Sequence, residues 1–222
     1  MTLTATTAVA LTAAAPATAA PKRAEAPAAA ATAYAKALDR AYADAERYVA
    51  ENQARLATTY WGCVATMQAA PQAQSAHAYR VVVMSAFAET VVRPGRTILR
   101  RLVARLDAVR TSDSALRGIR AVWGDALEVA ERSSDAADGC AQLERWKASG
   151  WADAAKPPLP EADAAALSTT EAQARRTERR VLAGTRRLRA LGAEPRPTTH
   201  VDPEALVTLL GDALPEPLSE AR

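Results

Sequence analysis

Histidine, cysteine, glycine and phenylalanine are scarce in this chain, whose 222 residues include two histidines, two cysteines, nine glycines and one phenylalanine. Two cysteines without histidines at ligand spacing cannot complete the tetrahedral shell of a structural zinc ion. The sequence also has no C-x-x-C pair, which a redox dithiol would need, and no glycine-rich loop of the kind that binds phosphate groups. We therefore predict no metal ligands and no cofactor.

Catalytic signals are missing as well. Ser85 and Ser114 have neither a glycine-framed elbow nor a plausible histidine partner. Acidic pairs such as Asp125 and Glu128 have the ordinary spacing of a helix surface, and the Glu-x-x-His pattern of di-iron bundles does not occur. We predict no catalytic residues and a protein that is not an enzyme. The alternative is an enzyme of an unrecognised type.

Alanine dominates the composition, and glycine is rare. Because alanine has the highest helix propensity and the sequence has no alternating β-branched runs with hairpin turns, an all-α protein is predicted. Long helices with short connections are typical of a bundle. We therefore expect an up-and-down bundle of three to four long helices, followed by a linked C-terminal amphipathic helix and a short terminal helix.

Prolines and turn residues divide this bundle into helices. The first is expected between Pro27 and Pro71, the second over residues 74–92, and the third from Pro94 onwards. The fourth begins near Ser112, in a Thr-Ser-Asp turn that is a typical N-cap signal. Gly62 in the first helix suggests a close helix approach or a local kink. In the second helix the expected inward side chains are Tyr79, Val82, Val83, Ala86, Phe87 and Thr90.

The first 27 residues have the form of an export signal, with an apolar small-residue stretch and an A-x-A site after Ala19 or Ala20, although no basic residue precedes that stretch. A disordered tail is the alternative. The longest apolar run elsewhere, Val81 to Val92, is too short to span a bilayer.

The expected units are a leader or tail (1–27), a helical bundle (28–151), a Pro/Ala linker (152–167), a C-terminal helical segment (168–214) and a tail (215–222).

Cys63 and Cys140 both fall on expected inward faces of different helices. In an exported protein such an isolated pair usually forms a disulfide, so we predict this bond. In a cytosolic protein the two would be buried free thiols. The prediction therefore depends on the compartment.

The most conspicuous charged feature is a helix that begins at a capping box, Ser168 to Glu171, and ends before Gly192. Its arginines are candidate anion-binding residues: Arg175, Arg176, Arg179, Arg180, Arg186, Arg187 and Arg189. The candidate partners are an anionic envelope polymer or a lipid surface. A solvated helix face is the simpler interpretation, which the charge count alone favours. A second basic cluster, Arg93 to Arg105, is also interpreted as a solvated face.

Three tryptophans, Trp61, Trp123 and Trp146, are expected near the two cysteines. They are candidates for lining an apolar cavity between helices, or simply core aromatics around the disulfide, which we favour. His77 could ligate haem in such a bundle, but positions 80 and 81 supply no second ligand. A carrier of a small apolar ligand or haem is therefore the second functional hypothesis.

The leading hypothesis is an exported, non-catalytic protein with a binding or structural role in the cell envelope or outside the cell. A cytoplasmic location is the alternative if the leader is only a tail. The net charge of +3 is too small to indicate nucleic-acid binding. The arginine helix also lacks the interleaved aromatic residues that stack on single strands. We therefore predict no nucleic-acid partner and no transmembrane segment in the mature chain.

Overall fold

A computed structural model describes residues 26–132, 138–159 and 171–214, and the regular structure in these ranges is entirely helical, which confirms the all-α prediction. The elements are α1 (Pro27–Gln68), α2 (Gln72–Phe87), the π-helical turn η1 (Ala88–Val92), α3 (Arg93–Ala108), α4 (Ser114–Arg132), α5 (Gly139–Ala148), the short η2 (Asp153–Ala155), α7 (Glu171–Ala190), η3 (Thr198–Val201) and α8 (Pro203–Gly211). Nearly all of the expected leader, much of the linker, the residues Ser168 to Thr170 of the capping box and the C-terminal tail lie outside the described residues.

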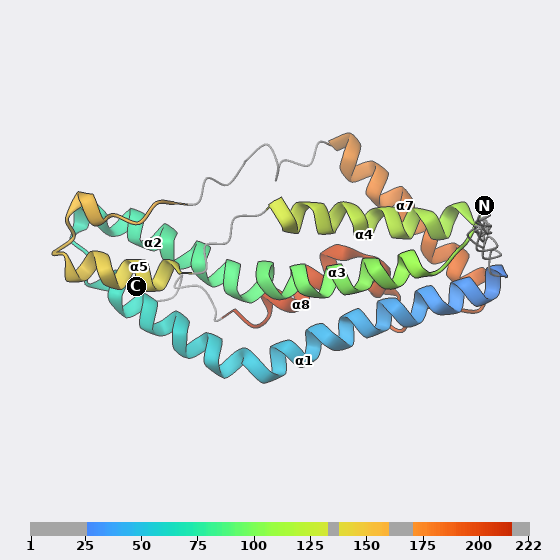
Figure 1. Ribbon diagram of the computed structural model, residues 1–222, viewed down its shortest axis with the longest axis horizontal. Helices are drawn as coiled ribbons and strands as arrows, with labels where there is room; N and C mark the ends of the chain where they lie inside the picture. The colour runs from blue at the N-terminus through green and yellow to red at the C-terminus, as the bar shows by residue number, and fades with distance from the viewer. Residues whose placement is uncertain (1–25, 133–137, 160–170, 215–222) are drawn as a thin grey trace, which may run out of the picture.

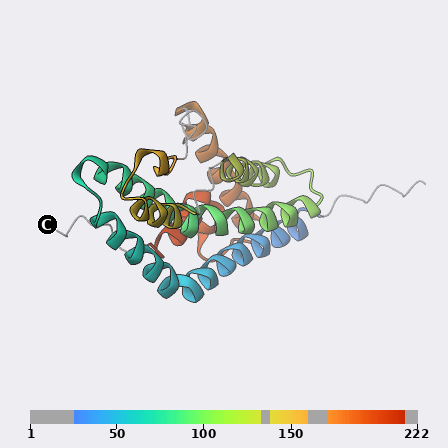
Figure 2. The same ribbon diagram turned by 60° about the vertical axis from the view of Figure 1, so that its left-hand side comes forward.

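The frame of the fold is α1 and the long helical run that returns along it. α1 has 42 residues, which corresponds to about 63 Å at the usual rise. α2, η1 and α3 follow one another without a break and pack antiparallel to α1 (Figures 1 and 2). The buried apolar residues form two clusters, and each cluster occupies one half of α1.

The larger cluster lies on the N-terminal half of α1. There the buried face of α1 is rich in alanine, including Ala30, Ala41 and Ala45, and these small side chains allow close approach of neighbouring helices. α3, α4, α7 and α8 cover this face. The C-terminal helices are part of the same core, because Leu188 of α7 and Leu206 of α8 are buried in it.

The smaller cluster lies on the C-terminal half of α1, between α1, α2 and α5. Its largest members are Leu143 and Trp146 of α5, both fully buried. Cys63 of α1 and Cys140 of α5 form the predicted disulfide, with 5.3 Å between their Cα atoms. Closure of the 77-residue separation stabilises the fold by about 4 kcal/mol in the chain-entropy model. The disulfide thus holds a short helix on a small core.

The π-helical turn η1 sits where the two clusters meet, and Pro94 explains its unusual hydrogen bonding. Arg93 donates its backbone N–H to the carbonyl of Ala88, five residues back. The next donor in this register would be residue 94, but proline has no N–H, so the carbonyl of Glu89 loses its partner. The hydroxyl of Tyr48 on α1 donates to that carbonyl at 2.9 Å. A side chain of α1 therefore completes the backbone ladder of the opposite helix.

The exposed face of α2 differs from the prediction. Tyr79, Val83 and Phe87 were expected to face inward, yet their exposed fractions are 48%, 42% and 46%. The inner face instead carries smaller residues, including Val81 and Ser85, because α5 approaches closely here. A Cβ atom added to Gly139 of α5 would lie 2.9 Å from Cβ of Ser85. Bulky side chains do not fit on this side of the helix.

Glycine has a packing role in α7 rather than in α1. A Cβ atom added to Gly62 would meet nothing within 4 Å, so the suggested close approach at Gly62 is wrong. A Cβ atom added to Gly184 of α7 would lie 2.4 Å from Cγ1 of Ile119, which is fully buried in α4. The missing side chain at Gly184 therefore allows α7 to cross α4 closely.

The two glycines provide a matched pair of substitutions. Gly184→Ala should destabilise the protein, because overpacking of about 1–3 kcal/mol exceeds the gain in helix propensity. Gly62→Ala should stabilise it by up to about 1 kcal/mol, because nothing obstructs the new methyl group. Urea unfolding followed by circular dichroism measures both changes. Equal changes in the two variants would contradict the close crossing of α7 and α4.

The contact between Tyr48 and Glu89 provides a second test. Tyr48→Phe should cost about 0.5–1.5 kcal/mol of unfolding free energy, because the carbonyl of Glu89 loses its donor. In a Pro94→Ala background residue 94 has its own N–H, so the same substitution should cost less. Denaturant unfolding of the four proteins in this double-mutant cycle gives the coupling energy. If Tyr48→Phe costs the same in both backgrounds, the lack of an N–H at Pro94 is not the reason why the carbonyl of Glu89 needs Tyr48.

Candidate functional site: an arginine groove between α4 and α7

The buried contacts of the arginine helix α7 lie in its C-terminal half. Gly184 and Leu188 are its only buried residues. Within Glu171 to Arg180, every residue except Thr177 is exposed. In Figure 1 this half of α7 extends above α4 and away from the rest of the bundle. Residues with high helix propensity, such as Ala, Arg, Gln and Glu, allow the helix to continue beyond its anchor.

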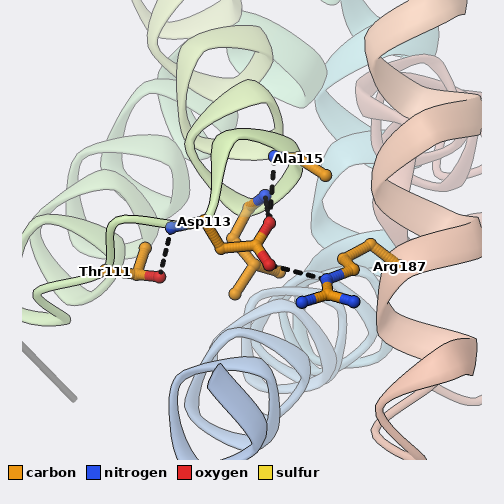
Figure 3. Close-up of polar contacts among 5 residues, drawn as sticks. Thr111, Asp113, Ala115 and Arg187 are labelled. Atoms are coloured by element: carbon orange, nitrogen blue, oxygen red, sulfur yellow. Dashed lines mark hydrogen bonds and ion pairs between the residues drawn. The ribbon is translucent and has the colours of Figure 1, made fainter. Parts of the chain in front are cut away.

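One arginine of α7 is part of the anchor. Nε of Arg187 donates to Oδ2 of Asp113 at 2.6 Å, while Oδ1 of Asp113 accepts the backbone N–H groups of Ala115 and Leu116 at 3.0 and 3.3 Å (Figure 3). Asp113 is thus the N-cap of α4 and the ion-pair partner of α7 at once. Desolvation acts to raise the pKa of Asp113, but the bonds from Arg187, Leu116 and Ala115 outweigh it and hold the pKa below its ordinary value.

Three further arginines of α7 have carboxylate partners. Arg175 pairs with Glu171 one turn earlier, and Arg189 pairs with Glu194 at 2.6 Å. Arg180 reaches across to Asp125 of α4 at 3.3 Å. Most of these groups are substantially exposed, so each pair stabilises the fold only slightly. Their main effect is to reduce the positive charge that this side of α7 offers to a partner.

Arg176, Arg179 and Arg186 have no carboxylate partner within the described part of the chain. Nε of Arg176 donates to the carbonyl of Ala172 at 3.4 Å, and Nε of Arg179 donates to the carbonyl of Arg175 at 3.2 Å. These bonds to uncharged acceptors leave the guanidinium charge uncompensated. The candidate arginines of the sequence therefore divide into four with carboxylate partners and three without.

Two of the uncompensated arginines border two hollows along the exposed half of α7. A groove of about 310 Å³ lies between α7 and the start of α4, and it is lined by Ser114, Ala115, Gly118, Arg176, Arg179, Arg180 and Ala183. A second, open hollow of about 610 Å³ is lined by Ala172, Arg175, Arg176, Glu178 and Arg179. Arg176 and Arg179 belong to both. We call the first of these hollows the arginine groove.

The arginine groove has the chemistry of an anion site. A planar guanidinium group presents a fork of N–H donors that matches a carboxylate or a phosphate. Arg179 and Arg180 lie three and four residues after Arg176, so the Cβ atom of each is about 5–6 Å from that of Arg176 on the helix surface. The stem of Arg180 lies beside Gly118, with its Cγ 3.8 Å from the position that a Cβ at residue 118 would take, which is an ordinary contact distance. The groove can therefore accept repeated negative charges.

The three tryptophans do not form one cavity. Trp123 is fully buried in the larger cluster and Trp146 in the smaller one, at opposite halves of α1. Trp61 has an exposed fraction of 47% and contacts the ring of Tyr60. The three residues therefore neither line one cavity nor gather around the disulfide, which was the favoured interpretation. Only Trp146 packs in the cluster that holds the disulfide.

Both histidines are held by other parts of the protein. Nε2 of His77 lies 2.7 Å from the carbonyl oxygen of Pro157, and its ring stands edge-on to Trp146. Nδ1 of His200 lies 2.8 Å from Oδ1 of Asp39, and its ring stacks on Tyr42 at 3.8 Å. No group of three or more histidine, cysteine or acidic residues suited to a metal occurs within residues 26–132, 138–159 and 171–214. These contacts make both histidines tethers between segments.

The sequence identified the arginines, but it did not show which of them have carboxylate partners. The Thr-Ser-Asp turn predicted an N-cap near residue 113, and Asp113 fills that role. Nothing in the sequence linked Asp113 to Arg187, which lies 74 residues later. The pairing arises because α7 crosses α4 antiparallel at Gly184. A glycine in the middle of an otherwise charged helix was the available signal.

The double role of Asp113 predicts how α4 and α7 respond to substitution. Asp113→Ala removes the cap and the ion pair and should cost about 1–2 kcal/mol, whereas Arg187→Gln removes only the pair and should cost less. Because the folded pKa lies below the unfolded value of about 3.9, this stabilisation is present above that value and is lost as the pH falls through the folded pKa. Urea unfolding between pH 2.5 and 7 tests both points, and an unchanged acid dependence in Asp113→Ala would contradict them.

No protein-family model, curated protein or solved structure matches this chain, so its geometry is the basis for a functional assignment.

Proposed function

We propose that the protein is an exported, non-catalytic binding protein that attaches through α7 to an anionic polymer of the cell envelope or extracellular space. The observation that carries this proposal is the exposed half of α7, where Arg176 and Arg179 have no carboxylate partner and border two hollows. A helix that is anchored at one end and exposed around its other half provides a preorganised row of cations. This preorganisation reduces the entropy cost of binding.

A polymer fits this surface better than a single small anion. Both hollows are open, and the two arginines between them can contact successive charges of a chain that crosses the helix. A lipid surface fits less well, because an interfacial helix needs a broad apolar face with large anchors. The whole of α7 has no aromatic residue, and its only exposed large apolar side chain is that of Leu182.

Nucleic acid is a poorer candidate for the same surface. Across α7, seven arginines are opposed by Glu171 and Glu178, and the carboxylates of Asp113, Asp125 and Glu194 already compensate three of those arginines. The remaining unpaired charge is small for a helix that would follow a nucleic-acid backbone. Aromatic residues for base stacking are absent from α7.

One observation supports export. The disulfide between Cys63 and Cys140 is a bond that persists in oxidising compartments. Its partners are the two cysteines that the chain contains. Among the helices of residues 26–132, 138–159 and 171–214, none combines the length and the apolar character that a bilayer crossing requires.

The proposal is tested with a double substitution in the exposed half of α7. Arg176→Gln together with Arg179→Gln should weaken binding to polyphosphate and to polygalacturonate, two polymers that present phosphate and carboxylate charges. We expect a loss of about tenfold or more at low salt, because two charge-assisted contacts are removed. The dependence of log affinity on log salt concentration should also become shallower by about 1–2. Fluorescence anisotropy with labelled polymer measures both quantities.

The matched control is Arg80→Gln together with Arg145→Gln. These exposed arginines lie on α2 and α5, at the other end of the molecule, and neither pairs with a carboxylate in the described part of the chain. The control changes the net charge equally, so it should retain most of the affinity. An equal loss of affinity in both double variants would mean that only the net charge matters, and it would refute the site on α7. Tighter binding to anionic vesicles or to duplex DNA than to either polymer would refute the choice of partner.

A further inference from the structure

A second open cleft lies beside the π-helical turn, between α1 and the start of α3. Its volume is about 430 Å³, within the usual range of small-molecule sites. The lining residues are Asp44, Arg47, Tyr48, Glu51, Glu89, Arg93, Pro94, Thr97, Ile98 and Arg101. It shares no residue with the arginine groove. π-helical turns often occur at functional sites, and this one forms part of the cleft wall.

Part of the cleft lining is apolar. Pro94 and Ile98 are buried residues of α3 that border it, and the ring of Tyr48 borders it from α1. Tyr48 is held in place by its bond to the carbonyl of Glu89. Burial raises the pKa of the Tyr48 hydroxyl, so it stays protonated and continues to donate this bond at neutral pH. An apolar ligand group would therefore meet a fixed surface.

Charged side chains from both helices surround this apolar surface, and some of them have ion-pair partners while others have none. On the α1 side Asp44 lies 3.6 Å from Arg47 and 3.8 Å from Arg105, whereas Glu51 has no cationic partner within the described residues. On the other side Glu89 pairs with Arg93 at 2.8 Å. Arg101, further along α3, has no carboxylate partner in the same described ranges. One uncompensated anion and one uncompensated cation thus line the cleft from different helices.

We propose that this cleft binds a small zwitterion with an apolar body, of the chemical class of an apolar amino acid or a short apolar peptide. The carboxylate of the ligand pairs with Arg101, its ammonium group pairs with Glu51, and its apolar part covers Tyr48, Pro94 and Ile98. A ligand with only one charge can pair with only one of these two residues. This inference is independent of polymer binding by α7, because the two surfaces have no residue in common.

Three related probes separate the two charges. Phenylalanine carries both, N-acetylphenylalanine lacks the ammonium group, and phenylalanine amide lacks the carboxylate. Each is titrated into the full-length, disulfide-bonded protein at low salt, and backbone amide shifts of α1, η1 and α3 are followed by NMR. We expect phenylalanine to bind about fivefold to tenfold more tightly than either derivative, because each derivative loses one charge-assisted contact.

Substitution of the two unpaired groups should change these preferences separately. In Arg101→Gln, phenylalanine should lose its advantage over the amide but keep its advantage over the N-acetyl derivative. In Glu51→Gln, the reverse should hold. The matched controls, Arg117→Gln on α4 and Glu46→Gln on α1, change exposed groups outside the cleft and should leave all three affinities unchanged. All four residues are exposed, so the variants should fold, which circular dichroism checks.

Two results would overturn the proposal. One is equal binding of the three probes, which would mean that the charged groups of the cleft do not contribute to binding. The other is the absence of shifts in α1, η1 and α3 up to 20 mM phenylalanine and up to 20 mM of the dipeptide leucyl-phenylalanine. Neither result bears on polymer binding by α7, which the Arg176→Gln and Arg179→Gln variant tests separately.

Discussion

The apolar face of α1 has to be covered along a helix of 42 residues, about 63 Å, and no single short helix can cover it. Its partner is therefore another long helical run, α2–η1–α3, and the remaining helices complete each half. α3, α4, α7 and α8 bury many side chains on the N-terminal half, whereas α2 and α5 bury few on the C-terminal half. The disulfide lies in the second half, where the smaller core contributes less stabilisation.

The junction between the two halves follows from one missing hydrogen-bond donor. Pro94 cannot donate to the carbonyl of Glu89, and Tyr48 of α1 supplies the donor instead. The long helices are thus held together at the point where neither buried cluster is extensive. Glu89 of this turn, together with Pro94 and Ile98 of α3, also lines the cleft beside α1. The backbone constraint and the candidate binding site therefore share residues.

The fold class, the N-cap near residue 113 and the pairing of the cysteines could be predicted from local sequence, because they depend on propensity, capping chemistry and the number of thiols. The orientation of α2 could not. Its bulkiest side chains, Tyr79 and Phe87, are exposed, since the close approach of α5 at Gly139 selects small residues on the inner face. Hydrophobic periodicity locates an amphipathic helix, but it does not show which neighbour limits the size of the buried side chains.

The arginines of α7 show that the sequence alone is also insufficient to predict a binding site. A count of seven does not distinguish Arg187, which helps to hold α7 on α4, from Arg176 and Arg179, which have no carboxylate partner. That distinction depends on where the helix crosses its neighbour. Because Gly184 fixes the crossing near the C-terminal half, the carboxylates of Asp113 and Asp125 lie within reach of Arg187 and Arg180 but not of Arg176 or Arg179. The geometry of a glycine contact therefore determines which positive charges remain available for binding.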